Sequence, residues 1–203
     1  THLMKNSEWG AVAYLSISDY GKNDEGWINN DRNYTTGCAA NSVDENENDG
    51  CPNRYESTAG VKASTTGNIY GIYDLAGGAW ERVAAYVDNG HSNLKGRGSS
   101  IISASAKYKD IYTKGNPDNQ LNNYGLAINK KGDAVYETSN NIDGSYSWFN
   151  DYSYMPNADG PWFERGARSG SGSHAGAYSI SDTTGVMNSR SGFRPVLVVN
   201  SGL

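Results

Sequence analysis

The pattern of apolar and polar positions along the 203 residues predicts only a few regular elements. Residues 2–16 predict a helix, because Trp9, Ala13 and Leu15 fall among apolar positions that roughly share one helical face. Asn6 and its polar neighbours fall on the opposite face, which predicts that they are exposed. The stretch 79–87 resumes an apolar pattern after a turn that is rich in glycine.

Shorter patterns of apolar and polar residues predict further elements along the chain. The stretch 69–75 alternates like a short strand or turn, while 104–115 and 122–139 predict short amphipathic helices that glycines interrupt. In the last quarter, 160–166 and 193–199 are apolar and strand-like, and a segment of Ser, Gly, Thr and Asn separates them. No internal repeat and no interdomain linker is visible, so the pattern predicts one domain.

Composition predicts that residues 1–203 form a single loop-rich domain with modest regular structure. Charged residues make up only 19% of the chain while 25 residues are glycine, so much of its polarity comes from turn-forming residues. The chain has 15 tyrosines and 5 tryptophans against 3 phenylalanines. Tyrosine combines an apolar ring with a polar tip, which suits contact surfaces and equally suits the edges of a thin core.

Charge and hydropathy each exclude one class of partner. The net charge is −5, and no basic stripe interleaves with aromatic residues, so we expect no nucleic-acid ligand. No apolar run approaches the roughly 20 residues of a membrane-spanning helix, so we expect no membrane insertion by this domain. The first residues already have the pattern of a folded domain. This leaves a cytosolic protein or, as we expect, the C-terminal part of a longer exported protein.

Two cysteines favour the exported alternative. Cys38 and Cys51 lie in the long polar stretch 21–55 and flank a short acidic loop. Two cysteines that close a turn-rich loop favour a disulfide, which is typical of oxidising compartments. The alternative is two free thiols beside a surface loop. With the disulfide, we expect the domain to be extracellular or on a cell surface.

Motifs for most enzyme chemistries are missing. His2, His91 and His174 are far apart in sequence and lack the spacing of metal ligands. The stretch 67–78 lacks the lysine and hydroxyl residue of a phosphate-binding loop. The acidic run 44–50 begins like a calcium loop but lacks its invariant glycine and final glutamate, so it predicts a solvated loop. We therefore expect neither a metal nor a cofactor.

Three motifs point to a family: GNIYGIYDLAGGAWE at 67–81, RGARSGS at 165–171 and GFRPV at 192–196. In combination they resemble the formylglycine-generating-enzyme/sulfatase-modifying-factor family, over roughly residues 66–199. The resemblance implies an α+β, C-type-lectin-like single domain, rich in loops, with short antiparallel strands and few helices.

The same resemblance implies structural roles for Asp74, Glu81, Arg165 and Arg194. Buried charges must be paired, and two acids that face two arginines would satisfy this condition. An acid–base pair of Asp74 and Glu81 is the catalytic alternative. The chemistry of the family depends on two cysteines in the C-terminal part of the domain, whereas this chain has none after Cys51. We therefore expect no enzyme activity.

A second resemblance concerns residues 161–197, which are similar to the variable region of proteins diversified by retroelements. In that group a lectin-type frame holds a hypervariable ligand surface. The similarity implies a ligand-binding face that consists of Arg168, Ser169, Ser171, His174, Tyr178, Ile180, Asp182, Thr183, Thr184, Met187, Ser189 and Arg190.

The implied function is a non-catalytic adhesin or receptor-binding module, displayed on a cell, a pilus or a virion. Its expected partner is a protein or glycan on a cell or host surface. An oxidase-type enzyme of the same fold and a structural pilin-like subunit are the alternatives.

Overall fold

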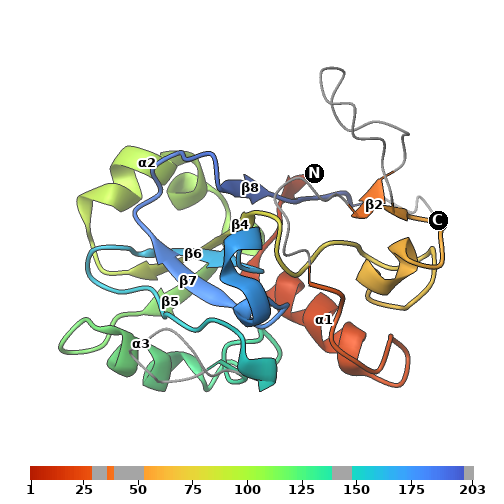
Figure 1. Ribbon diagram of the computed structural model, residues 1–203. Coiled ribbons are helices and arrows are strands. Elements are labelled where there is room, and N and C mark those ends of the chain that lie inside the picture. Colours follow the sequence, from red (N-terminus) through yellow and green to blue (C-terminus); the bar gives the residue numbers. More distant parts are fainter. Residues whose placement is uncertain (29–35, 39–52, 139–147, 199–203) are drawn as a thin grey trace, which may run out of the picture.

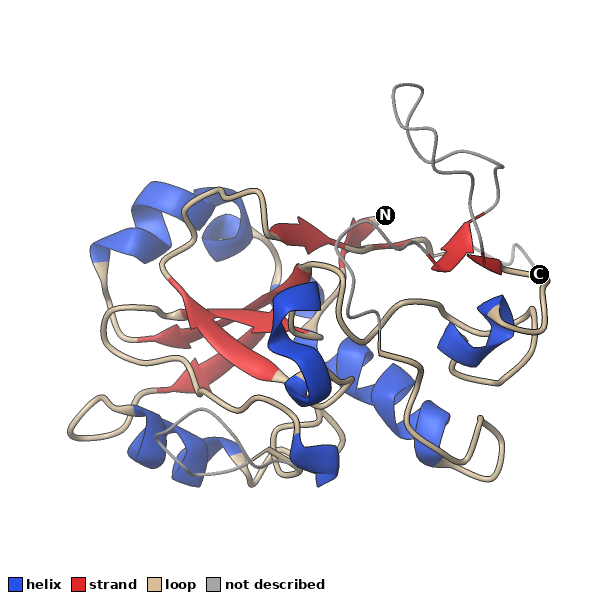
Figure 2. Ribbon diagram, viewed as in Figure 1, coloured by secondary structure: helices blue, strands red, loops and turns tan. Residues whose placement is uncertain are grey.

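The computed structural model describes residues 1–28, 36–38, 53–138 and 148–198, which form a mixed α+β structure with few helices and short strands (Figure 1, Figure 2). The helices are α1 (Asn6–Ile17), α2 (Ser92–Ser103) and α3 (Gln120–Ala127), with 3-10 helices η1 (Gly60–Ala63), η2 (Ala106–Tyr108), η3 (Trp148–Asn150) and η4 (Ser169–His174). The strands are β1 (His2–Leu3), β2 (Thr36–Cys38), β3 (Asn53–Arg54), β4 (Trp80–Asp88), β5 (Asp110–Thr113), β6 (Trp162–Arg165), β7 (Ile180–Thr183), β8 (Ser191–Phe193) and β9 (Pro195–Val196).

The main sheet is built around β4 and has the order β5-β4-β6-β7. Strand β4 pairs antiparallel with β6, and β6 pairs antiparallel with β7. On its other edge β4 pairs in parallel with two strands, β8 along Trp80–Arg82 and β5 along Ala85–Asp88. The expected antiparallel strands are present, but the sheet is mixed, because the longest strand shares one edge between two parallel neighbours.

The chain also brings its first and last described strands together. Strand β1 pairs antiparallel with β9, so that His2 lies opposite Val196 and Leu3 opposite Pro195. The backbone N–H of Met4 extends this contact by donating to the carbonyl of Arg194 at 3.0 Å.

The two faces of the sheet bury different side chains. Alternation along β4 sends Val83 and Val87 into the main core and Tyr86 to the opposite face. On that opposite face Tyr86 packs with Trp162 of β6 and with Leu94 of α2. Figure 1 shows α2 above the sheet, with α1 and α3 below it.

Helix α1 contributes its buried stripe to the main core. Trp9 and Ala13 lie one turn apart and are completely buried, and Trp9 Nε1 donates to the carbonyl of Ala177 at 2.7 Å. Beside Trp9, a Cβ atom at Gly10 would lie 2.5 Å from the backbone of Asp133. Glycine at this position therefore lets the helix approach the neighbouring segment closely.

Asn6 lies in the same stripe, which corrects the expectation that it is exposed. It is completely buried, and its Nδ2 donates to the hydroxyl of Tyr112 at 2.8 Å and to the carbonyl of Asp133 at 3.0 Å. The Tyr112 hydroxyl donates to the Asp133 carboxylate at 2.6 Å, and the Tyr112 ring packs on Phe163. An amide whose donors are bonded can be buried at modest cost, which polarity alone does not predict.

Arg165, at the end of β6, is a fully buried cation. Its Nη2 donates to the carbonyl of Ala134 at 3.0 Å, and the acidic groups of Asp133, Asp151 and Glu137 act on it electrostatically. Burial lowers the pKa of Arg165 to about 10 against the influence of these acids, so the guanidinium stays charged at neutral pH. This burial supports a structural role for Arg165.

A second arginine pairs with the acids of the first motif. Arg194 Nε donates to Glu81 Oε2 at 2.9 Å, Nη2 donates to Glu81 Oε1, and Nη2 also reaches the backbone carbonyl of Asp74 at 3.3 Å. Burial raises the pKa of Asp74 to about 7, although Arg194 opposes that shift. The expected single group of two acids and two arginines is therefore wrong in one respect, because Arg165 lies in a separate acidic cluster.

The glycine-rich turn before β4 is hydrogen-bonded to the loop that follows β6. Gly77 and Gly78 have φ values of 80° and 68°, which residues with a side chain rarely adopt. The Gly77 N–H donates to the carbonyl of Gly166 at 2.8 Å, and the Gly78 carbonyl accepts from the N–H of Ser169 at 2.9 Å. Two of the sequence motifs thus lie against each other.

A pair of carboxyl groups links the loop after α1 to the segment after η3. Glu25 and Asp151 are hydrogen-bonded through their side chains, and Asp151 also accepts the backbone N–H of Tyr178 at 2.8 Å. Burial, with the neighbouring Asp151 charge, raises the pKa of Glu25 to about 8, and burial raises that of Asp151 to about 6. The pair therefore holds a proton at neutral pH.

Several expected elements differ from the observed ones. The strand-like stretch 160–166 contains β6, which confirms that prediction, and 193–199 contains the short β9. The stretch 104–115 forms η2 and β5 rather than one helix, because its apolar residues pair with β4. Helix α3 ends at Ala127, and an irregular buried segment follows. The backbone of Cys38 ends β2, but its side chain and all of Cys51 lie outside the described residues, so the disulfide stays a prediction.

We expect Arg165→Met to destabilise the protein by about 3 kcal/mol or more, because it leaves buried acids without their cation. Arg168→Met, three residues later at a half-buried position, is the matched control and should change stability little. Urea denaturation of both variants measures the difference. Equal midpoints for the two variants would contradict the structural role of Arg165.

The raised pKa of Glu25 predicts a dependence of stability on pH. The folded protein keeps the Glu25 proton up to about pH 8, whereas the unfolded chain releases it near the ordinary value of 4.5. Stability from this group is therefore present at acidic pH and is lost as pH rises through about 8. At pH 8.5, Glu25→Gln should raise the free energy of unfolding by roughly 1–2 kcal/mol relative to wild type, after allowance for partial exposure. The variant should therefore melt at a higher temperature than wild type at pH 8.5, and the difference should be smaller at pH 5. A variant that is less stable than wild type at pH 8.5 would contradict this account.

Candidate functional site

The segment implied to be the ligand face divides into parts with different exposure. It starts with η4, continues through a turn at 175–179 that is buried, and then forms β7. The loop 184–190 that follows is mostly exposed. Only some of the twelve implied contact residues are therefore accessible.

Tyr178 and Ile180 belong to the core, which corrects their assignment to the contact face. Tyr178 is 2% exposed and Ile180 is completely buried, and both pack in the main apolar cluster. The rings of Tyr14 and Trp148 lie 6.1 and 5.7 Å from that of Tyr178. Small residues on both sides of Tyr178 hid this burial in the sequence, because a lone tyrosine among Gly, Ala and Ser has no core periodicity.

An open cleft of about 490 Å³ lies where the accessible part of the segment meets the sheet. Five of the twelve implied residues line it: Arg168, Asp182, Thr183, Ser189 and Arg190. Four further lining residues were not predicted: Trp80, Glu164, Asn188 and Ser191.

Strand pairing explains how these distant residues meet. Trp80 of β4 lies opposite Ser191 of β8. In β6, Glu164 lies two residues after Trp162, and Trp162 is paired with Thr183 of β7. Residues two apart on one strand point to the same face, so the floor of the cleft comes from four strands of one sheet face. The position of Trp80 directly before the Glu of the first motif was the available signal for this residue.

The floor of the cleft holds a paired acid. Glu164 is buried, and its Oε1 accepts from Arg82 Nε at 3.2 Å and from Ser191 Oγ at 2.8 Å. Arg82 also donates through Nη1 to the carbonyl of Gly185 at 2.9 Å and through Nη2 to that of Val186. An ion pair between half-buried Arg82 and buried Glu164 therefore fixes the start of the exposed loop that forms the rim.

Asp182 borders the cleft, but its carboxylate lies against the loop 157–160. It accepts from Asn157 Nδ2 at 3.4 Å, and a Cβ atom at Gly160 would lie 2.4 Å from its Oδ2. Burial raises the pKa of Asp182 to about 6, with a further contribution from the charge of Glu164. The carboxylate is thus turned toward protein groups.

The remaining implied residues lie outside the cleft lining. Thr184 accepts from Arg97 Nη1 at 3.0 Å, and Met187 is 90% exposed at the tip of the loop. Ser169, Ser171 and His174 are half-buried in η4. These five residues are not part of the cleft lining.

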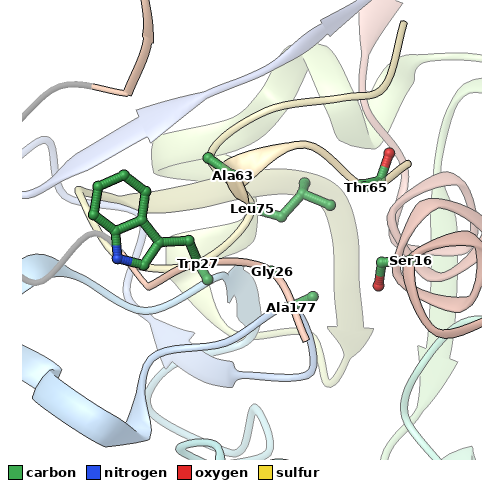
Figure 3. A pocket seen from close by; sticks show the side chains of 8 residues that line it. Ser16, Gly26, Trp27, Ala63, Thr65, Leu75 and Ala177 are labelled. Atoms are coloured by element: carbon green, nitrogen blue, oxygen red, sulfur yellow. The ribbon is translucent and has the colours of Figure 1, made fainter. Parts of the chain in front are cut away.

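Other cavities fit a ligand less well. The cavity of about 10 Å³ in Figure 3 lies between Trp27 on one side and Ser16 and Thr65 on the other, and it holds at most one water molecule. A pocket of about 90 Å³ between α2 and the sheet is lined by Ile101 and Phe163 among others, and is too small for a ligand of ordinary size.

A third opening, of about 450 Å³, lies beside Glu25 and Trp27. It is next to residues outside the described part of the chain, which begin at position 29. Among the described residues, no group of three or more His, Cys, Asp and Glu side chains could hold a metal ion. The cleft over the sheet is therefore the best-defined candidate site.

Comparisons of the chain with protein-family models, with curated proteins and with solved structures find no match. Within the described ranges, no helix has the length and apolar character needed to cross a bilayer.

The corrected position of Tyr178 gives a direct prediction. Tyr178→Ala should cost about 3 kcal/mol of stability, since it empties a buried aromatic position. Met187→Ala, at the exposed loop tip, is the control and should leave the melting temperature unchanged. Thermal unfolding monitored by circular dichroism tests both variants. If Tyr178→Ala melts like wild type, the tyrosine is accessible after all.

Proposed function

We propose that the chain is a non-catalytic ligand-binding module that uses the cleft over β4, β6, β7 and β8 as its contact site. The observation that supports this most is the convergence of Arg168, Thr183, Ser189 and Arg190 on one cleft. They come from the segment after β6, from β7 and from the loop 184–190, and Trp80 of the distant strand β4 lies in the same cleft. Side chains of varied chemistry on a rigid sheet are typical of binding sites.

The way the rim is held also supports a binding role. Arg82 and Arg97 bind the first part of the loop 184–190, at Gly185 and Thr184, and β8 fixes its other end. Ser189 and Arg190 lie in the exposed part of this loop. A loop that is fixed at both ends loses little conformational freedom when it binds, and its exposed positions can differ at little cost in stability.

The proposal also includes a fold family and a place where the protein is displayed. A C-type-lectin-like domain similar to the retroelement-diversified proteins, displayed on a cell, pilus or virion, accounts for the three motifs and for the position of the cleft. The oxidase alternative requires two cysteines in the C-terminal part, and the sequence has none there. We propose a protein or glycan on a cell or host surface as the partner.

We expect the purified domain to bind members of an array that carries surface polysaccharides and surface proteins. Ser189→Tyr should then weaken this binding at least about tenfold, because a large side chain occupies the cleft whatever the charge of the ligand. Ser99→Tyr, at an exposed position on α2, adds the same side chain outside the cleft and should bind like wild type.

Both variants should melt within a few degrees of the wild-type protein, since both positions are exposed. Binding that survives Ser189→Tyr would place the contact site elsewhere. The absence of any bound array member would contradict the proposed function as a whole.

A further inference from the structure

The arginines in and near the cleft differ in whether they form ion pairs with described residues. Among the described residues, the guanidinium groups of Arg82 and Arg194 form ion pairs with glutamates. Arg168 and Arg190 both line the cleft, and neither forms an ion pair with any residue that the structure describes. Their hydrogen-bond donors are therefore available to a ligand.

The acids of the cleft do not neutralise these two arginines. Glu164 is already bonded to Arg82 and Ser191, and its side chain is only 7% exposed. Asp182 turns its carboxylate toward Asn157 and Gly160, as described above. The charges that remain for a ligand are thus two cations, which match a carboxylate or sulfate group.

The rest of the lining suits a carbohydrate better than a protein surface. Of the nine lining residues only Trp80 is apolar, and the others include the hydroxyls of Thr183, Ser189 and Ser191. Protein partners generally require a cluster of desolvated apolar anchors, which this cleft lacks. A sugar instead offers many hydroxyl groups for hydrogen bonds and C–H groups that can lie against an aromatic ring.

Trp80 is well placed to be that ring. It is half-buried, and its ring is braced edge-on by Tyr152, with 5.6 Å between the ring centroids. Tyr152 in turn stacks on Tyr154 at 6.5 Å. The tryptophan is therefore held in a fixed position at the cleft wall, which reduces the entropy cost of binding.

We propose that the cleft binds an acidic carbohydrate, with its carboxylate or sulfate groups held by Arg168 and Arg190 and a sugar ring against Trp80. This inference rests on the proposed ligand-binding function and specifies its ligand class. Since the contact is partly ionic, rising salt concentration should weaken it.

Isothermal titration calorimetry with defined probes tests the proposal. The probes are an oligogalacturonide, a heparin-derived oligosaccharide, neutral maltohexaose and a hexaglutamate peptide. We expect binding of at least one of the two acidic oligosaccharides, and binding of maltohexaose and of the peptide at least about tenfold weaker. The two acidic probes distinguish a carboxylated from a sulfated ligand.

The double variant Arg168→Gln/Arg190→Gln should weaken binding of the acidic oligosaccharide at least about tenfold. Arg54→Gln removes one arginine from an exposed position that does not line the cleft, and it should bind like wild type. Circular dichroism melting curves show whether the variants are folded. We expect that they are, because none of the three arginines is fully buried.

Failure of both acidic oligosaccharides to bind the wild-type protein would overturn the proposal. So would equal binding of hexaglutamate, which would indicate charge attraction alone, or unchanged binding by the double arginine variant. If the array instead identifies a neutral glycan or a protein whose binding Ser189→Tyr abolishes, the proposed function stands and the acidic-carbohydrate inference fails.

Discussion

A guanidinium group that is completely removed from water must be surrounded by acids and carbonyls, and Arg165 imposes this condition on the core. The groups that meet it come from separate segments: Asp133 and Glu137 follow α3, and Asp151 follows η3. These acids act on Arg165 electrostatically, and two of them are held by hydrogen bonds from other groups. Asp133 accepts the hydroxyl of Tyr112, and Asp151 accepts the N–H of Tyr178. Electrostatic attraction to one cation therefore acts on two irregular segments that lie outside the sheet.

The same strand links this core to the cleft. Strand β6 presents Arg165 to one face of the sheet and Glu164 to the other. Glu164 pairs with Arg82, which bonds to the carbonyl of Gly185 at the start of the rim loop. Each face of the sheet thus carries a buried charge, and the candidate site has strands as its floor although most of its surroundings are loops.

The sequence predicted the parts of the fold whose signal is local. Helix α1 was found because Trp9 and Ala13 have helical spacing, and β6 because Trp162 and Phe163 lie between glycine-containing turns. Helix α2 was missed, because its sequence SNLKGRGSSIIS is rich in Ser and Gly and only Leu94 of its residues is buried. Strand β5 was taken for a helix, since four residues in a parallel strand leave no distinctive pattern.

The residues of the candidate site were also predicted only in part. Residues on the exposed loop, such as Ser189 and Arg190, were predicted from the layout of the motifs. Trp80 and Glu164 were not, because their membership of the cleft depends on which strands pair and in which register. Conversely, Tyr178 was assigned to the surface, although hydrogen bonding of its backbone to a buried aspartate holds it inside. Long-range pairing of this kind is not encoded in any short stretch.

The pairing of β1 with β9 has a consequence for how this fold can be combined with other chains. Because His2 lies opposite Val196, a polypeptide that enters the domain at β1 and leaves it after β9 does so at neighbouring points. A domain with adjacent ends can be inserted into a surface turn of a host protein without forcing the two sides of that turn apart. The same adjacency allows a short linker to join β9 to β1 and the chain to be reopened elsewhere, which makes the fold suitable for circular permutation.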